Sequence, residues 1–240
     1  MSVRGPPALS LPVRRIGTWH KRETAMRTPP QGAVLVTGAS SGIGRACALH
    51  LDKAGYRVFA TVRQEKDAES LRQGAPDRFT TVMMDVTEGG YLARAAAAVA
   101  EAVGGAGLAG LVNNAGVGLP GPIELIPPHD LRRQFDINVL GPVRVTQAFL
   151  PIIRRARGRI VNIGSVGGQI TIPFGGALCA SKYAMEAIND AMRMELYSWG
   201  IHVILVAPAG ISTPAVDRLL RDGEAAIGRF SPEGRRRYEH

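Results

Sequence analysis

The stretch VLVTGASSGIGRA, Val34–Ala46, decides the fold. Its first residues form an apolar run typical of a buried strand, and the residues from Gly42 onward have the apolar spacing of a helix that ends at Gly55. Gly38, Gly42 and Gly44 lie where the strand turns into the helix. Glycine permits a tight turn and close approach of a ligand to the backbone, and the N–H groups at a helix N-terminus attract anions. The stretch therefore predicts a strand, turn and helix unit that holds a pyrophosphate group.

The rest of the chain repeats this alternation of short apolar runs and longer amphipathic segments. Near-continuous apolar strands separated by helices indicate a parallel sheet that is covered on both faces, with right-handed crossovers. We therefore expect a doubly wound, three-layer α/β/α fold with six strands. After residues 33–38, the predicted strands are 56–62, 79–86, 107–116, 158–165 and 201–208, and the predicted helices are 42–55, 67–74, 92–103, 130–155 and 177–200.

The length and composition fit one folded domain with an N-terminal extension. A chain of 240 residues that is 45% hydrophobic buries a substantial core, and we assign residues 31–240 to a single domain. Residues 1–30 are rich in proline and arginine, hold one acid (Glu23) and show no periodicity, which predicts disorder. Two alternatives remain for this segment: an arginine-rich targeting sequence, or a start site upstream of the true one at Met26.

Charge and cysteine usage narrow the function classes. The net charge of +9 includes clusters at Arg154–Arg159 and Arg235–Arg237, but no aromatic platform accompanies them, so we expect solvated faces and no nucleic-acid binding. Cys47 and Cys179 lie in helical patterns and have no metal-ligand spacing, which indicates no metal site and a reducing compartment, the cytoplasm. Since no apolar run reaches the roughly 20 residues of a membrane helix, no membrane span is expected.

Several short motifs resemble those of the short-chain dehydrogenase/reductase family, and in particular its steroid and retinol dehydrogenase-like branch. They occur in the family's order and spacing between residues 33 and 213. The resemblance implies a Rossmann-type domain, an NAD(P)-dependent oxidoreductase activity and a bound nicotinamide dinucleotide. The motifs are TGASSGIG (Thr37–Gly44), DV (Asp85–Val86), NNAG (Asn113–Gly116), the asparagine of FDINVLG (Asn138), IVNIGSV with Ser165, and CASK ending at Lys182.

The resemblance also assigns the cofactor site. Arg63 ends the run FATVR after the second strand, where an acidic residue would accept hydrogen bonds from a free ribose 2′-hydroxyl. Because an arginine pairs with a 2′-phosphate instead, we favour NADP over NAD, the alternative being that Arg63 only faces solvent. The residues implied are Gly38, Ser40, Ser41, Gly42, Ile43 and Gly44 for the pyrophosphate, Asp85 and Val86 for the adenine, and Asn114, Ala115, Gly116, Lys182, Ile211 and Thr213 for the remainder.

The catalytic positions show one departure from the family. Asn138, Ser165 and Lys182 match its asparagine, serine and lysine, but Leu178 stands where the family has a tyrosine, four residues before the lysine. No Tyr-x-x-x-Lys occurs anywhere in the chain. A leucine does not transfer protons, and losing a general acid removes about 10²–10⁴ of the rate. Two hypotheses follow: a weakened NADP-dependent oxidoreductase, or a catalytically silent NADP-binding pseudoenzyme that acts as a sensor or partner subunit.

The remaining expectations concern the substrate and the assembly. The loops 116–128 and 169–176 are apolar and follow strands, so we expect them to wall a pocket for an apolar alcohol and its ketone or aldehyde, steroid-like or retinoid-like. Ala209 replaces the glycine that the family has after Pro208. The family's usual last strand is not expected, so either the chain is truncated or its sheet has six strands and an open edge. The resemblance further implies a homodimer or homotetramer through the helices 130–155 and 177–199.

Overall fold

Six parallel strands form one sheet in the order β3-β2-β1-β4-β5-β6. The computed structural model describes residues 32–73, 79–213, 217, 221, 223–225, 227–228 and 230–238. The sheet order reverses direction between β1 and β4, which is the switch point where open α/β sheets bind ligands. The doubly wound fold and its six strands are thereby confirmed. The strands are β1 (Ala33–Val36), β2 (Arg57–Val62), β3 (Phe79–Met83), β4 (Leu108–Asn113), β5 (Arg159–Ile163) and β6 (His202–Val206).

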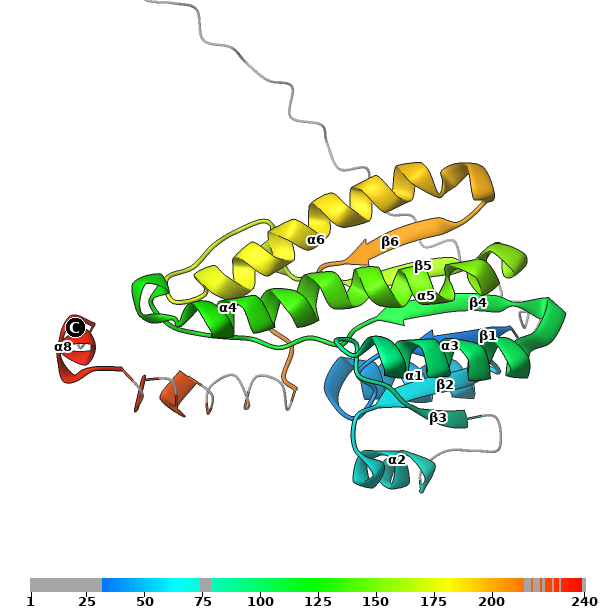
Figure 1. The fold of residues 1–240 in the computed structure, drawn as a ribbon, viewed down its shortest axis with the longest axis horizontal. Coiled ribbons are helices and arrows are strands. Elements are labelled where there is room, and N and C mark those ends of the chain that lie inside the picture. Colours follow the sequence, from blue (N-terminus) through cyan, green and yellow to red (C-terminus); the bar gives the residue numbers. More distant parts are fainter. Residues whose placement is uncertain are drawn as a thin grey trace, which may run out of the picture.

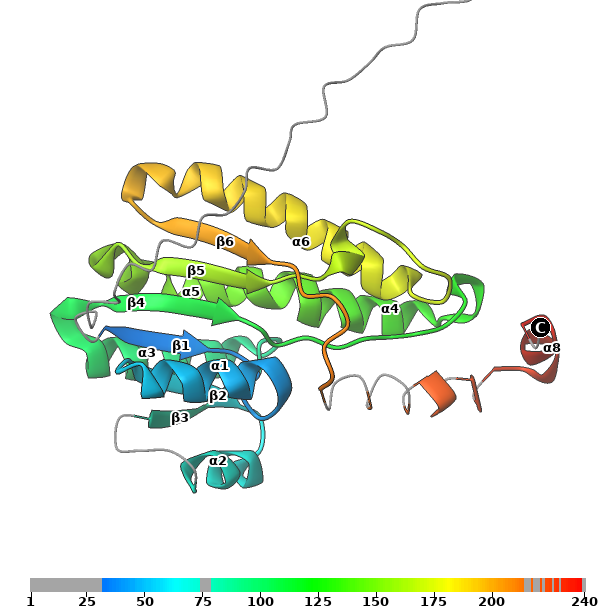
Figure 2. The ribbon, with the colours of Figure 1, turned by 180° about the vertical axis from the view of Figure 1, so that it is seen from behind.

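Helices cover both faces of the sheet. Figure 1 shows α3, α4, α5 and α6 in front of the strands, and Figure 2, seen from behind, shows α1 on the other face with α2 beside β3. The short helix α8 lies apart from these layers, at the end of the sheet toward which the strands point (Figure 1). The helices are α1 (Gly42–Lys53), α2 (Glu65–Arg72), α3 (Gly89–Val103), α4 (Pro128–Phe135), α5 (Gly141–Ala156), α6 (Gly176–Glu195) and α8 (Pro232–Arg236).

The core consists of two apolar layers, one on each side of the sheet. Leu35, Leu111 and Ile160 are fully buried on the side of α3 and α5, where Phe149 of α5 packs against them. Val58 and other strand residues form the second layer against α1 and α2. The absence of polar residues at these positions follows from burial on both faces, which parallel sheets require. This two-sided burial fixes the strand ends on which the candidate site is built.

The predicted helix 130–155 is helical throughout, but a π-helical turn divides it. The structure has α4, then a π-helical turn over Asp136–Leu140, then α5. In that turn the Gly141 N–H donates to the Asp136 carbonyl, five residues earlier. A side chain at Gly141 would meet Val86, since a Cβ there would lie 2.9 Å from a Val86 methyl. The close packing of Gly141 on Val86 accompanies the bulge, and Pro142 follows as a residue that the first turn of α5 tolerates.

The described residues do not test the predictions about the missing last strand, the disordered N-terminal extension and the oligomeric state. Strand β6 borders only β5 among the described residues, and its Ile204 and Val206 side chains are 40% and 45% exposed. The predicted disordered extension, residues 1–30, lies outside the described residues. In the part of the chain that the structure describes, no helix combines the length and the apolar character needed to cross a membrane. The oligomeric state stays a prediction.

Candidate active site

The turn between β1 and α1 needs its glycines. Gly38 and Gly42 have φ angles of +64° and +56°, which side chains other than glycine rarely adopt. A Cβ on Gly44 would overlap the Asn114 side-chain nitrogen and the Gly38 carbonyl oxygen. Ser41 is the residue before α1, so the unpaired N–H groups of the first helical turn open toward the glycine turn. The turn therefore packs closely against the end of β4 and has no room for larger residues at Gly44, and the backbone donors of the first turn of α1 lie beside it.

Thr37 and Asn114 fasten this turn to the end of β4. The Thr37 hydroxyl oxygen accepts hydrogen bonds from the N–H groups of Asn114 and Ala115, at 2.9 and 3.0 Å. In return, the Asn114 amide donates to the carbonyls of Thr37 and Gly38, at 2.9 and 3.1 Å. These bonds cross the switch point of the sheet and hold the two strand ends together. Asn114 of the NNAG motif thus positions the glycine turn through its side chain. Gly116 of the same motif is exposed.

Asp85 and Arg63 lie near each other at the ends of β3 and β2. The Asp85 carboxylate accepts hydrogen bonds from the Thr87 N–H (2.9 Å) and hydroxyl (2.7 Å). Burial opposes ionisation of Asp85, yet these bonds favour it, and the pKa of the carboxyl is lowered. The positive charges of Arg63 and Arg133 act in the same direction. Val86 is buried, whereas Arg63 is exposed and available to a ligand.

Asn138 lies in the π-helical turn before α5 and is buried. Its amide oxygen accepts from the Val117 N–H, and its nitrogen donates to the Val117 carbonyl, both at 2.8 Å. The same nitrogen lies 3.1 Å from the hydroxyl of Ser181 in α6. The Ser181 hydroxyl donates in turn to the carbonyl of Leu178, at 2.7 Å. Asn138 therefore ties the loop after β4 to the α6 turn that contains Leu178.

Lys182 of α6 contacts the end of β5, and Ser165 follows β5 in the sequence. The Lys182 ammonium donates to the Ile163 carbonyl at 2.9 Å, and burial lowers the pKa of Lys182 to about 8. Ser165 stands two residues after that carbonyl, and its hydroxyl accepts from the Gly167 N–H at 3.0 Å. The Lys182 ammonium thus contacts the last residue of β5, and Ser165 follows that strand by two residues.

Leu178 is half-buried and lies one helical turn before Lys182. Its neighbour Cys179 is buried, with its sulfur beside Gly167. Tyr183 is 44% exposed, so its ring lies at the surface of α6. The Ser181 hydroxyl donates to the Leu178 carbonyl. Leu178 has an alkyl side chain at the position where the family resemblance implies a phenol.

The segment after β6 reaches the glycine turn. A Cβ on Gly42 would lie 3.5 Å from the Thr213 Cβ, which places Thr213 against the turn. The preceding Pro208 carbonyl accepts from the Val166 N–H at 3.0 Å, so this segment also passes the end of β5. Ile211 is 44% exposed. Thr213 thus lies at the glycine turn, and it is half-buried, as are Ser40, Ser41 and Ile43 of the turn. Ala209, between β6 and Thr213 in the sequence, is exposed.

A buried polar network beneath the site was missed by the sequence analysis. The Asn113 amide donates to the Thr146 hydroxyl (3.1 Å) and to the Asn162 oxygen (2.9 Å), and Asn162 donates to Asn189 (3.0 Å). The network joins β4, β5, α5 and α6 one residue before the site. Polar residues inside otherwise apolar strands were the available signal. Buried groups without partners are costly, so these four side chains fix the relative positions of their elements.

The residues present fit a nicotinamide dinucleotide. The glycine turn, where Gly38 and Gly42 have positive φ angles and the first turn of α1 begins, suits a pyrophosphate, and it lies at the switch point between β1 and β4. Lys182 and Ser165 lie at the end of the next strand, β5, where the reactive end of an extended ligand would reach. The predicted site residues that the structure describes therefore gather along the carboxyl ends of neighbouring strands.

Comparison with known proteins agrees with this geometry. A family model described as short chain dehydrogenase matches residues 32–224. Retinol dehydrogenase 16 of Homo sapiens is 41% identical over 223 residues, which are 92% of this chain and 70% of that protein. Estradiol 17-beta-dehydrogenase 2 of Mus musculus is 42% identical over 186 residues, or 76% of this chain and 49% of that protein. The chain thus spans between about half and seven tenths of these relatives.

Solved structures show the same fold. A short chain dehydrogenase from Burkholderia cenocepacia J2315 in complex with NADP has a TM-score of 0.71 and 28% identity, covering 79% of this chain and 76% of that one. A 3-ketoacyl-(acyl-carrier-protein) reductase from Brucella melitensis complexed with NADH has a TM-score of 0.75 and 25% identity, covering 85% and 92%. The chain belongs to the short chain dehydrogenase family, a family of NAD(P)-binding oxidoreductases, and within it to the branch of the retinol and steroid dehydrogenases.

Proposed function

We propose that the chain is an NADP-dependent oxidoreductase that interconverts an apolar alcohol and its ketone or aldehyde, at a rate lowered by Leu178. The observation that supports the proposal is that Lys182 donates to the Ile163 carbonyl at the end of β5, two residues before Ser165, while the glycine turn lies at the end of β1. Asn138 supports this arrangement by joining the loop after β4 to α6. Both the binding site and most of the catalytic groups are thus present in one chain.

The choice of NADP rests on charge at the end of β2. Arg63 is exposed there, next to the half-buried Asp85, and its guanidinium offers paired donors to a 2′-phosphate. The two structural relatives carry NADP in one case and NADH in the other, so fold likeness alone does not choose between them. An acidic residue, which would select a free 2′-hydroxyl, does not occupy the position of Arg63.

In the reduction, the cofactor supplies a hydride to the carbonyl carbon of the substrate. Ser165 orients the carbonyl oxygen by a hydrogen bond, and the Lys182 ammonium holds the cofactor's ribose and stabilises the negative charge that develops on that oxygen. The oxygen then takes a proton from water, because Leu178 has none to give. In the reverse direction the same water accepts the alcohol proton. Without a positioned phenol, this proton transfer limits the rate.

The proposed substrate class follows from the loops beside the site. The Ile123, Ile172 and Phe174 side chains are 57%, 59% and 51% exposed, and they come from the loops after β4 and β5. A backbone hydrogen bond of 2.8 Å from Gly121 to Phe174 joins the two loops. Next to them, a pocket of about 240 Å³ is lined by Leu119, Pro120, Leu125 and Phe230, among others. Such walls favour a steroid-like or retinoid-like compound, in keeping with the names of the relatives.

One observation favours a second candidate function, a silent NADP-binding protein that acts as a sensor or partner subunit. Leu178 removes the proton donor, whereas the glycine turn and its hydrogen bonds need no such group. Binding can therefore persist where turnover has been lost. The retained Asn138, Ser165 and Lys182 still favour the first candidate, since a protein that only binds has no use for a serine placed at the substrate carbonyl.

The experiment measures NADPH binding and NADPH-dependent reduction of apolar ketones and aldehydes with one preparation. Binding together with slow turnover that Ser165→Ala abolishes supports the oxidoreductase. Binding without turnover supports the silent protein. Absence of NADPH binding contradicts both candidates. Ser231→Ala serves as the matched control, because Ser231 accepts an N–H from Gly234 in the same way that Ser165 accepts one from Gly167.

A further inference from the structure

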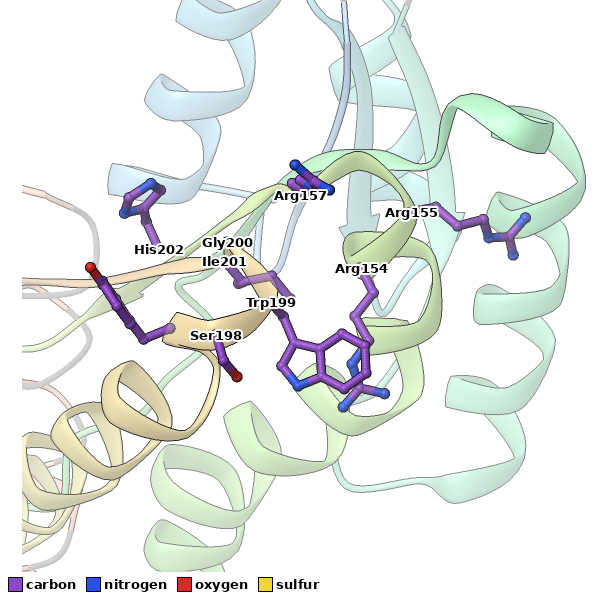
Figure 3. Close-up of a pocket in the computed structure, with 9 residues that line it drawn as sticks. Arg154, Arg155, Arg157, Ser198, Trp199, Gly200, Ile201 and His202 are labelled. Atoms are coloured by element: carbon purple, nitrogen blue, oxygen red, sulfur yellow. The ribbon is translucent and has the colours of Figure 1, made fainter.

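A second pocket lies away from the candidate active site, at the opposite ends of the strands. It is formed by the end of α5, the residue after it, and the turn that leads from α6 into β6, and its volume is about 830 Å³ (Figure 3). This volume is within the range of small-molecule sites. The lining residues are Arg154, Arg155, Arg157, Tyr197, Ser198, Trp199, Gly200, Ile201 and His202.

The pocket is strongly basic. Arg154, Arg155 and Arg157 line it, no aspartate or glutamate does, and no ion pair among the described residues involves these arginines. Arg155 points away from the pocket in Figure 3, and its guanidinium donates to the Gly104 carbonyl at 3.1 Å. Cations in the last turn of a helix complement its dipole, which accounts for Arg154 and Arg155 but not for Arg157 beyond the helix.

Arg157 has an unusual backbone. With φ 47° and ψ 48°, it adopts the left-handed conformation at the end of α5, a position that glycine usually occupies. Gly158 follows directly in the sequence. An arginine at such a position carries conformational strain that a glycine would avoid, and strained residues cluster at functional sites. The position at the end of α5 therefore does not explain why an arginine stands at residue 157.

An aromatic surface lies beside these charges. The Arg154 guanidinium lies 4.5 Å from the centre of the Trp199 ring, and Figure 3 shows the two side chains together at one wall of the pocket. Trp199 and Tyr197 are 54% and 78% exposed. Stacking on the indole orients the guanidinium, which leaves its N–H edge free for an anion. An exposed indole also offers a flat apolar surface to the carbon atoms of a ligand.

We propose that this pocket binds a phosphate-bearing ligand, with Arg154 and Arg157 contacting the phosphate and Trp199 packing against the adjoining carbon skeleton. Guanidinium groups bind phosphate through paired N–H donors, which suits two arginines without acidic neighbours. The phosphate can belong to a soluble phosphate ester or to the headgroup of an anionic phospholipid. The proposal is independent of the oxidoreductase proposal, because the pocket shares no residue with the candidate active site.

The test uses the fluorescence of Trp199. The chain has two tryptophans, so Trp19→Phe leaves Trp199 as the only one. The full-length Trp19→Phe protein is titrated with glycerol 3-phosphate, and separately with phosphatidylcholine vesicles that contain or lack about 20% phosphatidic acid. We expect a saturable fluorescence change from glycerol 3-phosphate, from the anionic vesicles, or from both, and the change weakens at high salt.

Variants of the arginines decide whether the pocket is responsible. Arg157→Gln and Arg154→Gln each weaken binding about tenfold or more, as loss of a charge-assisted hydrogen bond does. Arg94→Gln is the matched control, because it removes the same charge far from the pocket. Arg94 is exposed, and its guanidinium lies 4.7 Å from the centre of the Tyr91 ring in a similar stack. We expect it to bind as the parent does, and circular dichroism confirms that each variant is folded.

The outcomes separate the two sources of phosphate. A response to glycerol 3-phosphate alone identifies a soluble ester, and a response to the phosphatidic acid vesicles alone identifies a lipid headgroup. The proposal is overturned if neither changes the Trp199 fluorescence. It is equally overturned if Arg94→Gln weakens binding as much as Arg157→Gln, because the net charge of +9 would then explain the binding without any pocket.

Discussion

The glycine turn between β1 and α1 and the first turns of α6 are two regions of one candidate site, and they differ in completeness. Around the glycine turn, four hydrogen bonds join Thr37, Gly38, Asn114 and Ala115, and the Asn114 side chain leaves no room for a Cβ on Gly44. In α6, Lys182 is in place but Leu178 has replaced the proton donor. The difference teaches that cofactor binding and proton transfer rest on separate residues, so one can persist without the other.

The largest expected effect comes from filling the glycine turn. Gly44→Ala places a Cβ against the Gly38 carbonyl and the Asn114 amide, neither of which can move without breaking the contact between β1 and β4. We expect NADPH affinity to fall about a hundredfold, equivalent to about 2.7 kcal/mol. Isothermal titration calorimetry measures the affinity. Gly89→Ala is the control, since nothing lies within 4 Å of a Cβ at that residue, and unchanged binding by Gly44→Ala would show that the turn is not the site.

The next effect concerns the choice of cofactor. Arg63→Gln removes the proposed partner of the 2′-phosphate, and we expect NADPH to bind about tenfold or more weakly while NADH binding stays the same. Separate titrations with the two cofactors measure this difference. Lys66→Gln, an exposed charge three residues further on in the first turn of α2, is the matched control. An equal loss for both cofactors would mean that Arg63 supports the fold and does not read the phosphate.

A smaller effect separates ribose binding from folding at Lys182. Lys182→Met removes the ammonium that would hold the ribose, so we expect NADPH affinity to fall several-fold, roughly 1 kcal/mol. The same variant no longer buries a charge, so the free energy of unfolding of the cofactor-free protein should not fall at pH 7. Urea titration measures the stability. Weaker folding together with unchanged NADPH binding would reverse the role assigned to this residue.

The last effect is a pH dependence of stability and not of cofactor binding. The pKa of Lys182 is lowered to about 8 in the folded chain, so between about pH 8 and pH 10.5 the unfolded chain binds more protons than the folded one. The contribution of Lys182 to the free energy of unfolding therefore rises with pH between about pH 8 and pH 10.5 and is lowest below about pH 8. Urea titrations of the parent and of Lys182→Met across the window measure the difference between them. The same slope in both proteins would show that Lys182 titrates normally.

Much of the fold could be predicted from local pattern. Apolar runs and glycine positions predict all six strands, because an apolar run of strand length between turn residues can be recognised without its partner strand. The π-helical turn between α4 and α5 could not be predicted, since it accompanies the packing of Gly141 on Val86, which is 55 residues earlier in the sequence. Contacts of this range leave no periodic signal in the helix itself.

The site divides in the same way. Residues in sequence motifs, such as Ser165 and Lys182, could be placed because their spacing sets their positions on a strand end and a helix. The pairing of Asn113 with Asn162 could not, because it depends on the register of β4 against β5. The stack of Arg154 on Trp199 joins segments from different helices and was likewise invisible. The sequence thus predicted the side chains that belong to motifs. It did not predict the pairs of side chains that come together only in the folded sheet and its helices.

The most direct test of the central claim, that Leu178 limits turnover and leaves cofactor binding intact, is Leu178→Tyr. NADPH binding and NADPH-dependent reduction of apolar ketones and aldehydes are measured for the parent and the variant at saturating cofactor. The account predicts similar NADPH affinities and a variant that turns over about 10²-fold faster or more, because a positioned general acid is restored. A parent that turns over within about tenfold of the variant would contradict the account and require another proton donor.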